Sequence, residues 1–163
     1  MKCMQCGGGP VVTARENYRY DAVGLPGITL ANVQVTRCKA CGETGVVIHR
    51  IEELHRRIAN AVISKRDRLT PQEIRFLRKY LGLSGADFAR QMGTTRETVS
   101  RWENGASSMG VIAERLLRLL VERQEPVKDY RVELAEVAVG NPKPIRLTLG
   151  ADRRRGWETR KSA

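Results

Sequence analysis

Four cysteines in two matching pairs constrain the fold of this chain more than any other feature. They fall in two Cys-x-x-Cys-Gly motifs and are Cys3, Cys6, Cys38 and Cys41. Two thiols at this spacing can bend around one ion, the glycine lets the loop close with a positive φ angle, and two such loops complete a tetrahedral thiolate shell. The pattern predicts a Zn²⁺ site. Because four thiolates leave no open coordination position, we expect the ion to stabilise the fold and to do no chemistry.

Other uses of the cysteines fit the sequence less well. All four belong to the two motifs, disulfides are rare in cytoplasmic proteins, and a thioredoxin-type redox pair requires a βαβ setting that is missing here. Iron or a redox switch remain alternatives to zinc. His49 and His55 are the other candidate ligands, although four thiolates already close the shell.

Between the two cysteine motifs, apolar residues alternate as they do in β-strands. We predict strands over residues 12–20, 28–35 and 46–48, with a turn at 25–27. The alternation changes phase at Ala31-Asn32, which predicts a β-bulge. A sheet of this size buries little apolar surface, so we expect a small zinc-ribbon-like domain that depends on its ion.

From Ile51 onward the apolar period becomes helical. We predict a first helix over about 52–64, a charged break at 64–68, and a second helix that begins with a capping box formed by Thr70 and Glu73. Two short helices joined by the turn 93–95 follow, with Val99 and Trp102 as core anchors. Apolar residues at helical spacing then define a longer closing helix; they are Ile112, Leu116, Leu119 and Leu120.

These elements predict an α+β protein of three parts. The parts are a zinc-binding domain with a linker helix (residues 1–66), an all-α helix-turn-helix domain (67–124) and a basic C-terminal extension (125–163). In the extension, alternating apolar residues predict a β-hairpin with strands near 130–134 and 145–149 and a turn at 140–142. The basic run 153–155 is a candidate phosphate contact, although such ends are more often simply solvated.

Composition limits the partners. The 163 residues include 29 Lys and Arg against 18 Asp and Glu, a formal net charge of +11, so a polyanion is the first partner to consider. No apolar run is long enough for a membrane span, and the N-terminus has no signal-peptide pattern. The composition excludes a membrane protein and a charge-dominated disordered chain, and we expect a cytoplasmic protein.

Two motifs resemble known families. The run 83–105, which ends in Trp102-Glu103-Asn104-Gly105, resembles the Cro and phage-repressor class of helix-turn-helix domains. The paired cysteine motifs resemble the zinc-binding half of MqsA-type antitoxins, also called YgiT-type zinc finger proteins. That family joins the two domains in this order, and the resemblance covers about residues 1–120.

The resemblance implies a homodimer that binds a palindromic operator in double-stranded DNA through its helical half, while the zinc half binds a protein toxin. The implied DNA-binding residues are Thr95, Arg96, Glu97, Thr98 and Arg101. Arginine can bind guanine O6 and N7 with two hydrogen bonds, and threonine can contact a phosphate or a thymine methyl group. Many relatives have an amide side chain at the position of Glu97. We expect the Glu97 carboxylate to accept a hydrogen bond from cytosine N4 or to orient Arg101. Gly85 departs too, because phage repressors often have glutamine there.

Two other functional classes compete with this interpretation. The first is a zinc-stabilised helix-turn-helix transcription regulator that has no toxin partner. The second is an enzyme, but the sequence contains no Ser-His-Asp set, no phosphate-binding glycine loop and no paired carboxylates in a plausible pocket. We therefore predict a DNA-binding protein without catalytic residues.

Overall fold

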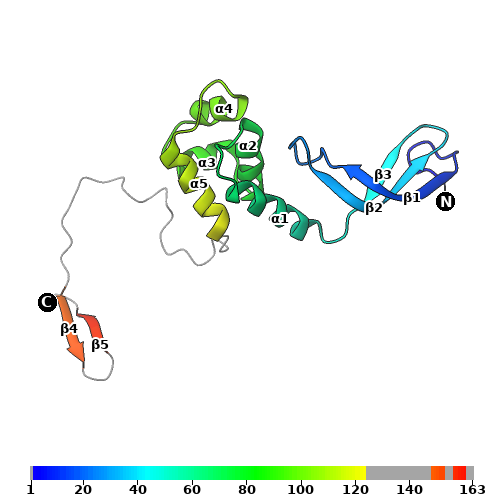
Figure 1. The fold of residues 1–163 in the computed structure, drawn as a ribbon. Coiled ribbons are helices and arrows are strands. Elements are labelled where there is room, and N and C mark those ends of the chain that lie inside the picture. The colour runs from blue at the N-terminus through cyan, green and yellow to red at the C-terminus, as the bar shows by residue number, and fades with distance from the viewer. Residues whose placement is uncertain (1, 124–147, 153–155, 161–163) are drawn as a thin grey trace. The chain divides into compact units, whose positions relative to one another are not determined.

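We describe the fold from a computed structural model, which covers residues 2–123, 148–152 and 156–160 in detail. The chain forms two compact units, Met1–Asp129 and Tyr130–Ala163, and each is described by itself. Within the described ranges, the first unit contains a three-stranded sheet and then five helices, and the second contains a two-stranded sheet (Figure 1). The predicted α+β class is confirmed. None of the helices in these ranges is long and apolar enough to cross a membrane.

The N-terminal sheet is antiparallel and has the strand order β1-β2-β3. Its strands are β1 (Val11–Arg19), β2 (Thr29–Cys38) and β3 (Thr44–Val47). The β1–β2 register shifts after Glu16, so that Ala31 and Asn32 together lie opposite Asn17. Asn32 has a φ of 53° and donates its backbone N–H to the side-chain oxygen of Asn17 at 3.1 Å. The bulge predicted at Ala31-Asn32 is therefore confirmed.

Few side chains of this sheet are buried. Val35, in the middle of β2, is 1% exposed, whereas Val12 is 45% and Val47 is 39% exposed. Tyr20 and Leu25, in the β1–β2 connection, are buried in a cluster that they share with the helices. The sheet has almost no core of its own, as expected for a domain held together by an ion.

The five helices begin and end close to the predicted positions. They are α1 (Ile51–Ser64), α2 (Pro71–Tyr80), α3 (Gly85–Gln91), α4 (Arg96–Asn104) and α5 (Val111–Arg123). The capping box is present: the Thr70 hydroxyl accepts from the N–H of Glu73, and the Glu73 carboxylate accepts from the N–H of Thr70. Gly105 ends α4 in the left-handed conformation, with a φ of 76°.

Helices α3 and α4 form the predicted helix-turn-helix arrangement. Gly93, in the turn between them, has a φ of 63°. Val99 and Trp102 are 2% and 8% exposed and anchor α4 in the same core as Phe88 of α3. The opposite side of α4 therefore faces solvent.

The predicted closing helix α5 is present, but it buries other residues than the four that define it in the sequence. Leu117 and Val121 are 0% and 1% exposed, whereas Ile112 is 85% and Leu119 is 44% exposed. Because α5 is apolar on two sides, helical periodicity alone cannot identify the side that packs on the chain's own core. Ile112 and Leu119, together with the half-buried Leu116 and Leu120, form what we call the α5 outer face.

A buried carboxylate fixes the segment between α1 and α2. Glu114 of α5 is 5% exposed. Its two oxygens accept from Arg68 at 2.6 Å, from Arg118 at 2.7 Å and from the N–H of Leu69 at 3.2 Å. Burial alone would raise the pKa of Glu114, but the hydrogen bonds from Arg68 and Arg118 bring the pKa below its usual value. This carboxylate is therefore ionised at neutral pH.

Arg118 extends the same network along the backbone. Its guanidinium donates to the carbonyl oxygens of Ile63 at 2.8 Å, Lys65 at 2.6 Å and Asp67 at 2.7 Å. The charged segment 64–68 is thus held against α5 by side-chain hydrogen bonds, although its composition suggests an open break between domains. We call Arg68, Glu114 and Arg118 the Glu114 network.

The second unit contains a short antiparallel hairpin. Its strands are β4 (Thr148–Asp152) and β5 (Gly156–Arg160), and Leu149 pairs with Thr159. Strand β4 begins within the second predicted strand, 145–149, but its partner β5 was not predicted. The first predicted strand, 130–134, and the predicted turn, 140–142, lie outside the described residues. Strand β5 gave little signal because Trp157 is its one large apolar residue.

The Glu114 network predicts how the segment 64–68 resists protease. Glu114→Gln removes the negative charge that pairs with Arg68 and Arg118. We therefore expect a loss of about 1–3 kcal/mol in the free energy of unfolding and faster tryptic cleavage after Lys65 and Arg66.

The effect should depend on pH. Because the pKa of Glu114 is lowered in the folded state, the stabilisation from its carboxylate is present above the unfolded pKa of about 4.3 and is lost as the pH falls. The difference between the variant and wild type should therefore shrink in acid.

Chemical denaturation and limited trypsin digestion measure the two effects. Glu122→Gln, at an exposed position of the same helix, is the control and should behave as wild type. Equal cleavage rates for wild type and Glu114→Gln would contradict the role given to this network.

Candidate metal centre and nucleic-acid interface

Two tight turns bring the cysteines to one end of the sheet. The N–H of Gly7 donates to the carbonyl of Cys3 at 2.9 Å, and the N–H of Gly42 donates to the carbonyl of Cys38 at 3.0 Å. Gly7 and Gly42 have φ angles of 68° and 75°, the positive values expected from the motif. Strand pairing of Val11 with Cys38 then places the two turns side by side.

The four sulfur atoms have the spacing of a zinc site. All four Sγ atoms lie within 4.8 Å of one another, and the thiols are free of disulfides. The Sγ atoms of Cys3 and Cys41 are 3.7 Å apart, as are those of Cys6 and Cys38. Tetrahedral Zn–S bonds of about 2.3 Å require sulfur atoms about 3.8 Å apart. The cysteines therefore fit Zn²⁺, and they form a structural zinc site that we call the four-cysteine site.

Electrostatics show why these thiols need a cation. The N–H of Gly8 and the neighbouring Cys41 thiol lower the pKa of Cys6 to about 6. The pKa of Cys41 rises to about 12: the N–H of Glu43 lowers it, but the neighbouring thiols, Cys38 first, and burial outweigh that effect. Four thiolates this close repel one another, so all four can ionise together only around a cation.

Neither histidine joins the four-cysteine site. Among the described residues, the one group with metal-ligand geometry consists of the four cysteines. His55 instead lies on α1 with its Nε2 3.0 Å from the Tyr20 hydroxyl, and the two rings stack with centroids 6.1 Å apart. His55 thus links the β1–β2 connection to α1, and His49 lies at the end of β3, away from the sulfur atoms.

Gly9 is a residue of the site that sequence reasoning missed. It is buried, and a Cβ atom added to it would lie 2.6 Å from the Cβ of Ala40 and 2.8 Å from the Sγ of Cys38. Both distances are shorter than real contacts of a Cβ atom. Gly9 therefore lets the first turn approach the second, and its place in a run of three glycines was the available signal.

The predicted DNA-binding residues lie at the start and along the outer side of α4. Thr95 is the N-cap, and its hydroxyl accepts from the N–H of Thr98 at 3.2 Å. Arg96, Glu97 and Arg101 are exposed, and Thr98 is half-buried. Val99 and Trp102 point the other way, into the core, so the charged residues share the solvent side of the helix.

The structure does not pair Glu97 with Arg101, so the alternative in which Glu97 orients Arg101 stays a prediction. A hydrogen bond from its own backbone N–H, followed by one from Thr95, lowers the pKa of Glu97, and the charge of Arg96 contributes. The carboxylate is therefore drawn toward the N-terminus of α4. Among the described residues, no ion pair joins Glu97 to Arg101.

A second set of residues holds α4 in place. Glu103, whose side chain is 8% exposed, accepts from the guanidinium of Arg78 at 2.5 Å and 3.0 Å. Arg78 also donates to the carbonyl of Leu83, just before α3, at 2.9 Å. This pair, with Trp102 beside it, fixes α4 to α2, and the partner Arg78 was not evident from sequence because it lies 25 residues from Glu103.

Comparison with known proteins identifies the chain. A model of the antitoxin component of the bacterial toxin-antitoxin system, MqsA, matches residues 1–131. The chain belongs to the MqsA antitoxin family. The resemblance seen in the sequence is confirmed, and membership of an antitoxin family means that the protein is not an enzyme. No curated protein matches the chain.

The close approach at Gly9 gives a test of the four-cysteine site. Gly9→Ala should force the two turns apart, at a cost of about 1–3 kcal/mol, and so lower zinc affinity by about 5- to 150-fold in a competition titration with a chromogenic chelator. Gly8→Ala is a matched control, since its added Cβ would meet no atom closer than 3.8 Å. Equal zinc affinity for the Gly9→Ala and Gly8→Ala variants would contradict the packing described here.

Proposed function

We propose that this antitoxin represses transcription in the cytoplasm by binding a palindromic operator as a homodimer, and that its zinc half binds the toxin. In this proposal residues 1–66 bind the toxin and residues 67–124 bind DNA, with the extension 125–163 following them. The observation that carries the DNA part is the position of Arg96 and Arg101 on the solvent side of α4, a short helix whose other side is fixed in the core.

The charges of the helical part support this assignment. Five of its arginines are held in ion pairs; these are Arg68, Arg75, Arg78, Arg90 and Arg118. Arg96 and Arg101 form no ion pair among the described residues, so their guanidinium groups are available for base edges and phosphates. The exposed hydroxyl of Ser100 lies between them in sequence. A helix that enters the major groove requires this arrangement of free donors on one side.

A variant of α4 tests the DNA assignment. Arg101→Ala should weaken operator binding by about 1–3 kcal/mol, or roughly 5- to 150-fold, and relax specificity at one base pair. Fluorescence anisotropy with the duplex upstream of the protein's own reading frame measures the effect. Arg56→Ala removes an equal charge from an exposed position of α1 and should change affinity little. Wild-type affinity in the Arg101→Ala variant would contradict the assignment.

The α5 outer face supports a homodimer. It places four apolar side chains at the spacing that usually marks a buried side of a helix, yet Ile112 is 85% and Leu119 is 44% exposed in the single chain. Exposed apolar patches of this kind mark protein interfaces. A two-fold axis through this face would pair the same residues of both copies, as isologous dimers require. Their α4 helices would then read half-sites about 34 Å apart.

The dimer is tested by placing a charge on this face. Leu119→Glu should convert the protein to a monomer in sedimentation-velocity ultracentrifugation, because a carboxylate buried between two copies would lack a partner. Asn60→Glu, at an exposed position of α1, is the control and should remain dimeric. If Leu119→Glu sediments as wild type does, the dimer does not form through α5.

Toxin binding distinguishes the proposal from its alternative, a zinc-stabilised helix-turn-helix regulator without a toxin. Family membership favours the antitoxin. Co-expression with the neighbouring reading frame and purification of the pair under native conditions tests this directly. A stable complex that requires residues 1–66 supports the antitoxin, and DNA binding without any such complex supports the alternative.

A further inference from the structure

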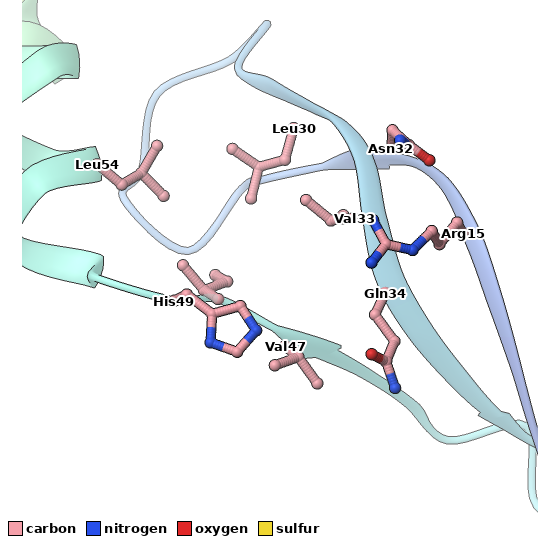
Figure 2. Close-up of a pocket in the computed structure, with 9 residues that line it drawn as sticks. Arg15, Leu30, Asn32, Val33, Gln34, Val47, His49 and Leu54 are labelled. Atoms are coloured by element: carbon pink, nitrogen blue, oxygen red, sulfur yellow. The ribbon is translucent and has the colours of Figure 1, made fainter.

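A groove of about 290 Å³ lies on the N-terminal sheet (Figure 2), and none of the four cysteines lines it. Its apolar lining comes from β2, from the end of β3 and from the first turn of α1. Those residues are Leu30, Val33, Val47, Ile48 and Leu54. Val47 is 39% exposed and the others are half-buried, so the groove presents apolar side chains to solvent.

The groove exists because β3 is short. Strand β3 pairs only with residues Gln34–Arg37 of β2 and ends at Val47. The preceding part of β2, from Thr29 to Val33, has no second neighbouring strand among the described residues. Arg50 then turns the chain into α1 with a φ of 53°. The result is an exposed strand edge beside an apolar groove, a combination that accepts an extended peptide segment.

The rim of the groove is positively charged. Arg15, Gln34 and Val47 pair across the three strands, so their side chains form one row on the same side of the sheet. Figure 2 shows the Arg15 guanidinium at one end of the groove and the His49 ring below it, next to Val47.

Arg15 is the uncompensated arginine of this sheet. Of the other two in β1 and β2, Arg19 pairs with Asp21 and Arg37 pairs with Glu16. Arg15 forms no ion pair within the described part of the chain. Residues 1–66 as a whole carry 10 basic and 5 acidic residues, so the surroundings also favour a negatively charged partner.

From this geometry we propose that the groove is the contact point for the toxin, and that it receives an extended segment in which an apolar residue lies next to a carboxylate. The apolar side chain enters between Leu30, Ile48 and Leu54, and the carboxylate pairs with Arg15. The inference rests on the proposed function, because it takes the zinc half to be the toxin-binding half. Beyond the proposed function, the inference names the surface that contacts the toxin and the side chains that the toxin segment must carry.

The test uses the zinc-loaded full chain and the protein encoded by the neighbouring reading frame, with affinity measured by isothermal titration calorimetry. Arg15→Glu and Val47→Asp each change an exposed side chain of the groove and should weaken binding at least tenfold. Arg56→Glu makes the same charge change as Arg15→Glu at an exposed position of α1 outside the groove and should stay within about twofold of wild type. Zinc content and circular dichroism confirm that each variant is folded.

The outcomes separate this inference from the proposed function. If wild type binds and both groove variants bind equally well, the groove is not the contact and the toxin-binding function stands. If wild type itself does not bind the neighbouring protein, both proposals fail. If Arg15→Glu weakens binding to operator DNA while binding to the neighbouring protein is unchanged, Arg15 contacts DNA rather than the toxin, and the inference is overturned.

Discussion

The mutual repulsion of four thiolates is the constraint on which the N-terminal half depends. Their sulfur atoms lie within 4.8 Å of one another, where they can all be charged only around a cation. Apart from the ligand Cys38, the sheet that carries them has one buried strand residue, Val35, so packing contributes little to its stability. The ion therefore stabilises the sheet in place of a hydrophobic core.

The helical half depends on a different principle. Its core contains large fully buried side chains, among them Leu77, Phe88 and Leu117, each 0% exposed. Polar contacts then orient the elements on that core: Glu103 and Arg78 hold α4, and the Glu114 network holds the segment that precedes α2. This rigidity suits the DNA binding proposed for α4, because a helix that is already fixed in its core loses little backbone entropy on binding. The antitoxin thus combines a metal-dependent domain with a core-dependent one.

Much of this could be predicted from local sequence. The cysteine spacing, the Thr70 capping box and the bulge at Asn32 depend on neighbouring residues, and the structure confirms all three. Features that depend on distant partners were missed. The buried face of α5 was not evident because both of its sides are apolar, and the Glu114 network joins residues 46 positions apart. Gly9 was missed because its role is set by the cysteine turn that packs against it.

The account claims that the sheet depends on its ion and that the helices do not. The most direct test is an amide NMR spectrum of the full chain before and after zinc is removed with a chelator. Resonances of residues 11–47 should collapse into the unfolded region, while those of α2, α3 and α4 keep their dispersion and positions. Strand resonances that stay unchanged in metal-free protein would contradict the dependence of the sheet on its ion. Loss of the helical resonances together with those of the strands would contradict the independence of the helical half.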